Sequence, residues 1–90
     1  MEKSLNELIN DTKKSLSLKK YDEALISLNL IIKKDAENLS ALSTIGDINV
    51  YRGKFIEAIE IFDKIIQINP KLSFIYNNKG FCLLKMLKYA

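Results

Sequence analysis

Mostly apolar residues recur along the chain at steps of three and four positions, which is the spacing of one face of an α-helix. Five such stripes follow one another, and each predicts an amphipathic helix of about twelve to fifteen residues. The stripes are Leu5, Leu8, Ile9, Thr12 and Leu16; Ala24, Leu25, Leu28, Ile31 and Ile32; Leu42, Ile45, Ile48 and Val50; Phe55, Ala58, Ile59, Phe62, Ile65 and Ile66; and Tyr76, Phe81, Leu83, Leu84 and Leu87. No run of β-branched residues alternates with polar residues over the length of a strand, so the pattern predicts an all-α fold.

Polar and helix-breaking residues mark where the predicted helices begin and end. Ser4 stands three residues before Glu7, which is the spacing of a capping box at a helix start. The expected N-caps of the third and fifth helices are Asn38 and Ser73. The residues expected to end the third and fourth helices are Gly53 and the pair Asn69-Pro70. Connections this short predict that consecutive helices are antiparallel.

The sequence also matches itself when it is shifted so that Lys20-Tyr21 falls on Lys54-Phe55. We call this displacement the repeat shift, and it also carries Glu23-Ala24 onto Glu57-Ala58. Its length, about 34 residues, is typical of helix-pair repeats. Chance supplies some apolar coincidences in a chain rich in Leu and Ile. It does not readily supply aromatic, Ala and Lys matches in a single register, so we infer an internal repeat.

This register resembles the tetratricopeptide repeat (TPR), a helix–turn–helix unit with small and aromatic residues at fixed positions. The best-matching repeat spans about residues 39–72 and departs from the usual pattern at Asn49 and Ile65. Its signature positions hold Leu42, Ile45-Gly46, Gly53-Lys54-Phe55, Glu57-Ala58, Phe62 and Pro70. The resemblance implies a right-handed α-solenoid of antiparallel helix pairs, with five helices in about two and a half repeats. Residues 1–90 would then form a single domain, with repeats at about residues 5–38, 39–72 and, truncated, 73–90.

Two glycines fall at equivalent places inside predicted helices, where glycine costs about 1 kcal/mol relative to alanine. They are Gly46 and Gly80, which the repeat shift superimposes. Their shared register predicts that each allows a close approach to the next helix, at positions of the Ala24 or Ala58 type.

Composition argues against catalysis. The chain contains no His and one Cys, so it lacks the default general base and the usual ligands of a zinc site. The carboxylate pairs Asp22/Glu23 and Glu57/Glu60 fall near predicted helix starts, where negative charge is favourable. Cys82 is expected to be a buried, inert thiol. We therefore expect no enzymatic activity, no cofactor and no metal site.

The TPR resemblance implies protein binding, because in that family the first helix of each repeat lines a concave groove. Three rows of side chains would cross the groove and hold a peptide or a helix: Ile9, Ser43 and Asn77; Lys13, Asp47 and Phe81; and Ser17, Tyr51 and Lys85. The alternative interpretation is that these residues are merely solvated. Ile9, Lys13 and Thr44 do not reproduce the Lys and Asn clamp with which some members bind chaperone tails, so we do not expect that ligand.

The same register places Lys88-Tyr89 just before a second helix that residues 73–90 do not include. The fifth helix would then keep an apolar surface open, and such a patch usually marks an interface. We expect self-association through Leu83, Leu84 and Leu87, which would give a homodimer. The alternatives are a purely structural homo-oligomerisation module and a fragment of a longer TPR array.

Charge is unevenly distributed, because residues 64–90 carry five lysines and no carboxylate although the net charge is only +3. A solvated basic surface is the simplest interpretation, and weak nucleic-acid binding is a less favoured alternative. The N-terminus lacks the basic start and apolar core of a signal peptide, and no apolar run is long enough to span a bilayer. We therefore expect a cytoplasmic scaffold with a protein or peptide partner and no membrane insertion.

Overall fold

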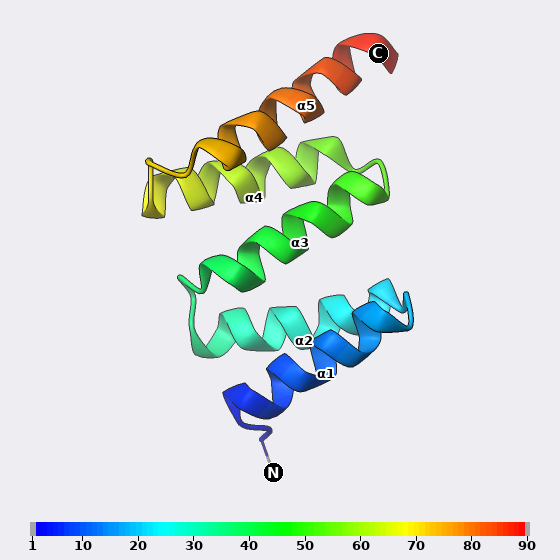
Figure 1. The fold of residues 1–90 in the computed structure, drawn as a ribbon, viewed down its shortest axis with the longest axis vertical. Helices are drawn as coiled ribbons and strands as arrows, with labels where there is room; N and C mark the ends of the chain where they lie inside the picture. The colour runs from blue at the N-terminus through cyan, green and yellow to red at the C-terminus, as the bar shows by residue number, and fades with distance from the viewer. Residues whose placement is uncertain (1, 90) are drawn as a thin grey trace. The chain divides into compact units, whose positions relative to one another are not determined.

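The computed structural model describes residues 2–89, without the side chain of Tyr89. Within this range the chain forms five α-helices and no strand, which confirms the all-α prediction (Figure 1). The helices are α1 (Leu5–Ser17), α2 (Tyr21–Lys34), α3 (Leu39–Tyr51), α4 (Phe55–Ile68) and α5 (Ser73–Tyr89).

The chain divides into two compact units, Met1–Ala41 and Leu42–Ala90. In the first unit α1 packs against α2, and the two helices run antiparallel (Figure 1). In the second unit α4 packs along α5, while Gly46 of α3 faces Phe62 of α4. The boundary falls inside α3, so α4 has a neighbouring helix both before and after it within the second unit.

The helix boundaries repeat with the period found in the sequence. The repeat shift carries α1 onto α3 and α2 onto α4 at both ends, and it carries the first residue of α3 onto the first residue of α5. The residues before α2 and α4 share their backbone conformation, since Lys20 has φ −91° and ψ 77° while Lys54 has φ −89° and ψ 70°. The repeat is therefore a property of the backbone as well as of the side chains.

The turns inside the two helix pairs are built alike. Lys19 and Gly53 occupy equivalent positions with φ of 58° and 75°, which is the left-handed region. The N–H of the next residue, Lys20 or Lys54, donates 2.8 Å back to the carbonyl oxygen five residues earlier. Such a bond is characteristic of a helix that ends through a left-handed residue. Glycine suits this position, whereas a lysine there holds a backbone conformation that side chains disfavour.

The expected helix ends are largely confirmed. Ser4 and Glu7 form the capping box, in which the Glu7 N–H donates to Ser4 Oγ at 3.2 Å and the Ser4 N–H donates to Glu7 Oε1 at 3.1 Å. Asn38 caps α3 by accepting the Ala41 N–H at 2.9 Å. The expectation for Ser73 is wrong, because Ser73 is itself the first helical residue of α5.

Each unit has its own hydrophobic core. The apolar side chains buried in the first unit are Leu8, Ala24, Leu28, Ile31 and Ala41. Thr12, Ser15 and Ser27 are buried beside them, and the Thr12 hydroxyl donates to the Leu8 carbonyl oxygen at 2.9 Å. Those buried in the second unit are Leu42, Ile45, Ile48, Ala58, Phe62, Ile65, Ile75 and Cys82. Burying one large side chain of this kind contributes about 1.5–3 kcal/mol, so these residues hold the helices together.

The apolar stripe expected for α5 is wrong. Its buried residues are Ile75 and Cys82, both fully inaccessible, and this face is the one that packs on α4. The stripe residues are all exposed on α5: Tyr76, Phe81, Leu83, Leu84 and Leu87. A helix that packs against only one neighbour buries one narrow face, and periodicity alone did not identify which face that would be.

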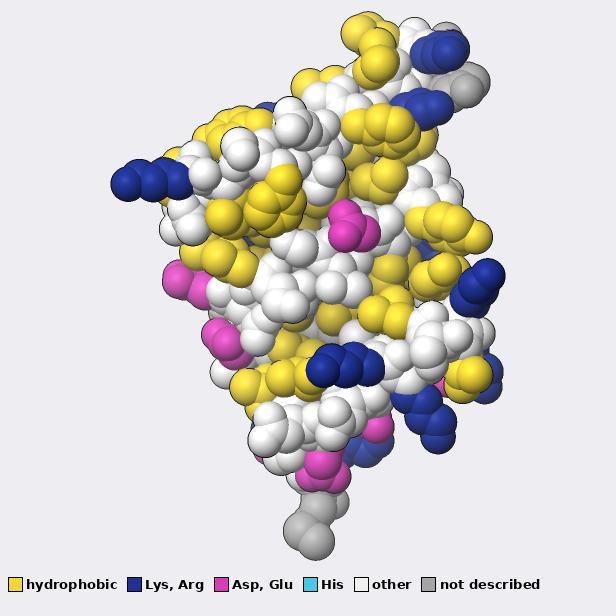
Figure 2. All heavy atoms as spheres, in the orientation of Figure 1, with side chains coloured by type: hydrophobic (Ala, Val, Ile, Leu, Met, Phe, Trp, Pro, Cys, Tyr) yellow, Lys and Arg dark blue, Asp and Glu magenta, His cyan; other side chains and the backbone are white. Residues whose placement is uncertain are grey.

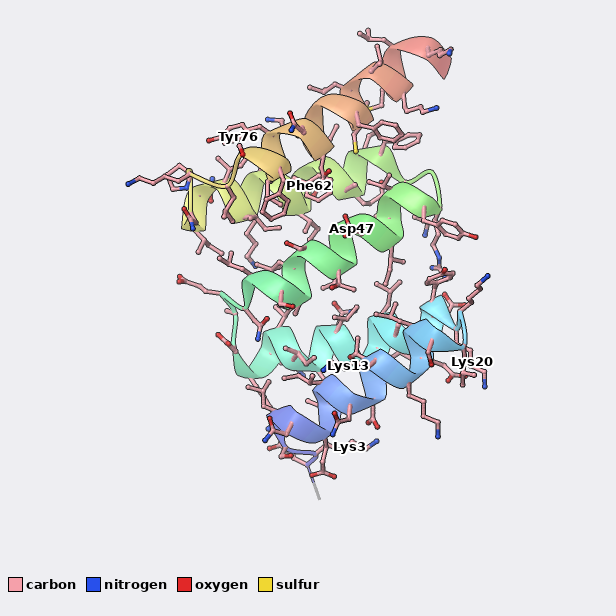
Figure 3. The ribbon with its side chains drawn as sticks, in the orientation of Figure 1. Lys3, Lys13, Lys20, Asp47, Phe62 and Tyr76 are labelled. Atoms are coloured by element: carbon pink, nitrogen blue, oxygen red, sulfur yellow. The ribbon has the colours of Figure 1, made fainter. Side chains whose placement is uncertain are left out.

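The packing role expected for the two glycines holds at one of them. A Cβ atom added to Gly46 would lie 2.5 Å from Cε1 of Phe62, so the helices approach closely here, but the neighbour is an aromatic ring and not Ala58 (Figure 3). A Cβ added to Gly80 would meet nothing within 4 Å. Within residues 2–89, no other element packs closely against Gly80, so the expectation for this glycine is wrong there.

Candidate functional site

Six of the nine residues predicted to bind a peptide lie on two helices of the second unit, α3 and α5. Along α3, Ser43, Asp47 and Tyr51 stand four residues apart and so share one helix face. Ser43 is half-buried, Asp47 is exposed, and Tyr51 has 72% of its surface exposed. A large aromatic side chain held this far out on a helix is suited to contact another molecule.

The corresponding residues of α5 are Asn77, Phe81 and Lys85, again four residues apart. The Lys85 Nζ lies 5.3 Å from the centroid of the Phe81 ring, within the range of a cation–π contact. Phe81 still exposes 46% of its surface. This helix therefore presents an aromatic ring beside a positive charge.

Asp47 differs from an ordinary surface carboxylate. Asp47 is labelled on α3 in Figure 3. Although the residue is exposed as a whole, protein atoms around its carboxyl group partly desolvate it, and this desolvation raises its pKa. A partly desolvated carboxylate gains more from a cationic partner than a fully hydrated one does. Asp47 is thus the acidic residue of this surface whose environment favours a bound cation.

The remaining predicted groove residues, Ile9, Lys13 and Ser17, lie along α1 in the first unit. Ile9 is half-buried, while Lys13 and Ser17 are exposed. The Ser17 hydroxyl donates to the Lys14 carbonyl oxygen at 2.8 Å, so it already has an acceptor. Each predicted row combines residues of both units, and the rows stay a prediction.

The residues predicted to self-associate are exposed. Leu83, Leu84 and Leu87 have 46%, 64% and 80% of their surfaces accessible, and Figure 2 shows hydrophobic side chains over α5 with lysines toward its C-terminal end. Gly80 and Tyr76 lie on the same helix face, one and two turns before Leu83 and Leu84. We call this set the open face of α5: Tyr76, Gly80, Leu83, Leu84 and Leu87. Sequence reasoning missed Gly80 as part of it, although its equivalence to Gly46 was the available signal.

Cys82 is buried as expected, on the face of α5 that packs against α4. Burial raises the pKa of its thiol, which keeps the sulfur protonated and poorly nucleophilic. Within residues 2–89, no three Cys, Asp or Glu side chains gather as a metal site would require. The carboxylates of Asp22 and Glu23 stand exposed in the first turn of α2, where they favour the helix N-terminus.

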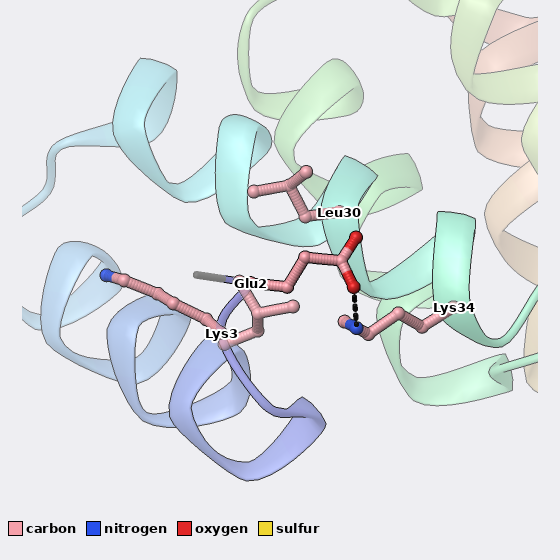
Figure 4. A pocket seen from close by; sticks show the side chains of 5 residues that line it. Glu2, Lys3, Leu30 and Lys34 are labelled. Carbon is pink, nitrogen blue, oxygen red and sulfur yellow. Dashed lines mark hydrogen bonds and ion pairs between the residues drawn. The ribbon is translucent and has the colours of Figure 1, made fainter.

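A shallow cavity of about 280 Å³ lies in the first unit beside the start of α1 (Figure 4). It is lined by Glu2, Lys3, Leu8, Leu30 and Lys34, and the Lys34 Nζ lies 3.5 Å from Glu2 Oε2 across it. Glu2 is almost fully solvated, and an exposed ion pair of this kind contributes only about 0–1 kcal/mol. The Glu2 and Lys34 side chains are therefore held only weakly in place for a small ligand.

A lysine and a tyrosine of α5 that could contact nucleic acid have partners inside the protein. The Lys79 Nζ lies 2.7 Å from Asp63 Oδ1 on α4, and the Tyr76 hydroxyl donates to the Pro70 carbonyl oxygen at 3.0 Å. A lysine neutralised by a nearby carboxylate attracts phosphate less strongly than an isolated one. The basic surface of α5 is thus weaker than its lysine content suggests.

Comparison with protein-family models and with curated proteins finds no match to this chain. In the described part of the chain, no helix combines the length and the apolar character needed to cross a membrane.

Proposed function

We propose that this chain is a non-enzymatic protein–protein interaction scaffold that binds a peptide or a helix through α3 and α5 of its second unit. The observation that carries the proposal is a pair of exposed aromatic side chains, Tyr51 and Phe81, interleaved with polar side chains at four-residue spacing. Aromatic anchors within a polar surround are typical of residues that dominate binding energy at protein interfaces.

The charges on these helices suit a peptide with both basic and acidic groups. Asp47 on α3 would attract a lysine or arginine of the ligand, and its partial desolvation strengthens that attraction. Lys85 on α5 would attract a carboxylate while Phe81 packs against an apolar group. A ligand of this kind is an extended or helical peptide with an apolar residue between opposite charges.

The recurrence of helix boundaries at the repeat shift supports the TPR-like nature of the scaffold. In such repeats the first helix of each pair carries the ligand, and here those helices are α1, α3 and α5. The right-handed solenoid and the three rows across the groove belong to this proposal.

The test is to select peptides from a display library against the full chain and to measure the affinity of one selected peptide by fluorescence anisotropy. Tyr51→Ala and Phe81→Ala should each weaken binding by about tenfold or more. Ile56→Ala is the matched control, because Ile56 is an apolar residue of α4 with 59% of its surface exposed. Equal losses in all three variants, or no loss in the first two, would contradict the proposal.

Self-association is a second candidate function, favoured by the exposure of Leu83, Leu84 and Leu87. In that case the open face of α5 would hold a second copy of the chain. Equilibrium sedimentation at high protein concentration tests this, since a dimer should form and Leu84→Asp should dissociate it. A monomer of 10.3 kDa at all concentrations would rule the candidate out.

Nucleic-acid binding is the weakest of the three candidates, given the internal partners of Lys79 and Tyr76. A filter-binding assay in which salt does not alter retention of RNA or DNA would exclude it.

A further inference from the structure

The open face of α5 is the largest run of exposed apolar side chains along one helix in the described residues, with Tyr76 at 45% and Leu87 at 80% exposure as its extremes. These residues stand at i, i+4, i+7, i+8 and i+11, so they line one side of the helix. This side of α5 faces solvent, because the side that packs against α4 is the one that carries the buried Ile75 and Cys82. An apolar helix face of this length costs free energy in water unless another surface covers it.

The same protein shows what covers the equivalent face of another helix. The repeat shift carries Leu42 and Gly46 of α3 onto Tyr76 and Gly80 of α5. Leu42 is 1% exposed, and Gly46 touches the ring of Phe62 from α4. On α3, therefore, the glycine of this face is covered by an aromatic ring from the helix that follows it.

The covering helices of both units share one pattern. Ala24, Leu28 and Ile31 of α2 correspond to Ala58, Phe62 and Ile65 of α4, and all six are at most 2% exposed. The middle residue of this pattern, Leu28 in α2 and Phe62 in α4, differs between the two units, and so does the residue at the Gly46 position of the preceding helix. A leucine accompanies Thr12 in the first unit, whereas a phenylalanine accompanies Gly46 in the second. Gly80 matches Gly46, and the space beside it is empty for at least 4 Å, so it favours an aromatic residue.

We propose that the open face of α5 binds one acidic amphipathic helix of a partner protein, in which a small residue, an aromatic residue and a β-branched residue stand at positions 0, 4 and 7. The aromatic ring sits over Gly80 as Phe62 sits over Gly46. This inference rests on the proposed function only in treating the chain as an interaction module. It concerns a different face of α5 from the one that carries Asn77, Phe81 and Lys85.

Charge decides between such a helix and a second copy of α5. Between Ser73 and Tyr89, α5 carries Lys79, Lys85 and Lys88 and no carboxylate. Lys79 is already paired with Asp63 of α4, and a second α5 offers no carboxylate to Lys85 or Lys88, whereas an acidic helix would offer one. The helix that α3 binds, α4, carries three carboxylates and one lysine, so an acidic partner helix has a precedent within the chain.

The probe is a peptide of residues 55–69 with a lactam bridge joining the side chains of Glu60 and Lys64. Both side chains are exposed on α4 and stand four residues apart, so the bridge holds the peptide helical without altering its apolar face. Its affinity for the full chain is measured by fluorescence anisotropy. The same peptide with Phe62→Ala serves as the control ligand.

We expect saturable binding that weakens by about tenfold or more in Gly80→Leu, whose added side chain fills the space meant for the ring. Leu84→Asp, at an exposed site that tolerates charge, should weaken it similarly, as should the control ligand. Phe74→Ala, exposed on another side of α5, should leave the affinity unchanged. Circular dichroism of each variant verifies that the helices are intact.

Three results would overturn the inference. One is no binding up to about 1 mM peptide. Another is equal affinity for the wild type and Gly80→Leu. The third is a concentration-dependent dimer of the chain alone that Leu84→Asp dissociates, because the face would then belong to a second copy. Tyr51→Ala should leave this peptide's affinity unchanged, so a failure of the α3 and α5 peptide surface is distinguishable from a failure of this one.

Discussion

Gly46 and Gly80 occupy equivalent positions on α3 and α5, but only at Gly46 does another side chain fill the space that a Cβ would need. Phe62, whose ring fills this space, is completely buried. The two glycines therefore distinguish a helix face that is covered from the same face left open.

Gly46→Leu should destabilise the protein by about 1–3 kcal/mol, because the new side chain would overpack the buried Phe62 ring. Urea unfolding followed by circular dichroism measures the change in the free energy of unfolding. An unchanged midpoint would show that α3 and α4 are not in close contact at Gly46.

A double-mutant cycle of Gly46→Ala and Phe62→Leu should show coupling. The smaller leucine makes room for the added Cβ, and the repeat shift carries Thr12 and Leu28 of the first unit onto these two positions. The double variant should be more stable than the sum of the single effects by at least about 0.5 kcal/mol. Strict additivity would argue that the two positions do not interact.

Gly80→Ala should have the opposite effect from a substitution at Gly46. The alanine Cβ meets nothing within 4 Å, and alanine has a higher helix propensity than glycine. The protein should therefore be more stable by up to about 1 kcal/mol. The measurement is the same urea titration. A loss of stability would mean that the space beside Gly80 is already occupied in solution.

The two left-handed turn residues predict a reciprocal pair of substitutions. Lys19→Gly should stabilise the protein by up to about 1 kcal/mol, since glycine adopts a positive φ without steric cost. Gly53→Ala should destabilise it by a similar amount for the converse reason. Thermal unfolding of both variants tests this, and a shift of the same sign in both would contradict it.

The raised pKa of Asp47 predicts a specific pH dependence. The folded protein holds the Asp47 proton more tightly than the unfolded chain does, so stability falls as pH rises from the ordinary value of 3.8 through the raised pKa. Asp47→Asn removes the cost of the desolvated carboxylate. Its free energy of unfolding at neutral pH should exceed that of the wild type by less than about 1 kcal/mol, since the group is largely solvated. The gain should vanish below the ordinary pKa. Stability curves that stay parallel at all pH values would contradict the desolvation of Asp47.

Local signals in the sequence were sufficient to predict all five helices and several of their ends. Ser4 with Glu7, Asn38 and Gly53 act through bonds or conformations within a few residues, so no knowledge of the packing was needed. The repeat register was equally readable, because equivalent residues meet equivalent local environments. Only the start of α5 was misplaced, by one residue at Ser73.

The faces of α5 could not be assigned in the same way. Its sequence is apolar around much of the helix, so periodicity permits several buried faces, and the choice depends on which neighbour packs against it. The register did contain the answer, since Ile75 and Cys82 are equivalent to the buried Ala41 and Ile48. The identity of the residue facing Gly46 was likewise a matter of packing, which sequence spacing does not specify.

The central claim is that α5 presents the helix-binding face with which α3 holds α4, and methyl NMR tests it most directly. The lactam-bridged peptide of residues 55–69 is titrated into the full chain while the leucine methyl resonances are followed. The account predicts saturable shifts for Leu83, Leu84 and Leu87, with those of the buried Leu8 and Leu28 unchanged. Shifts confined to other leucines, or no shifts at all, would contradict it.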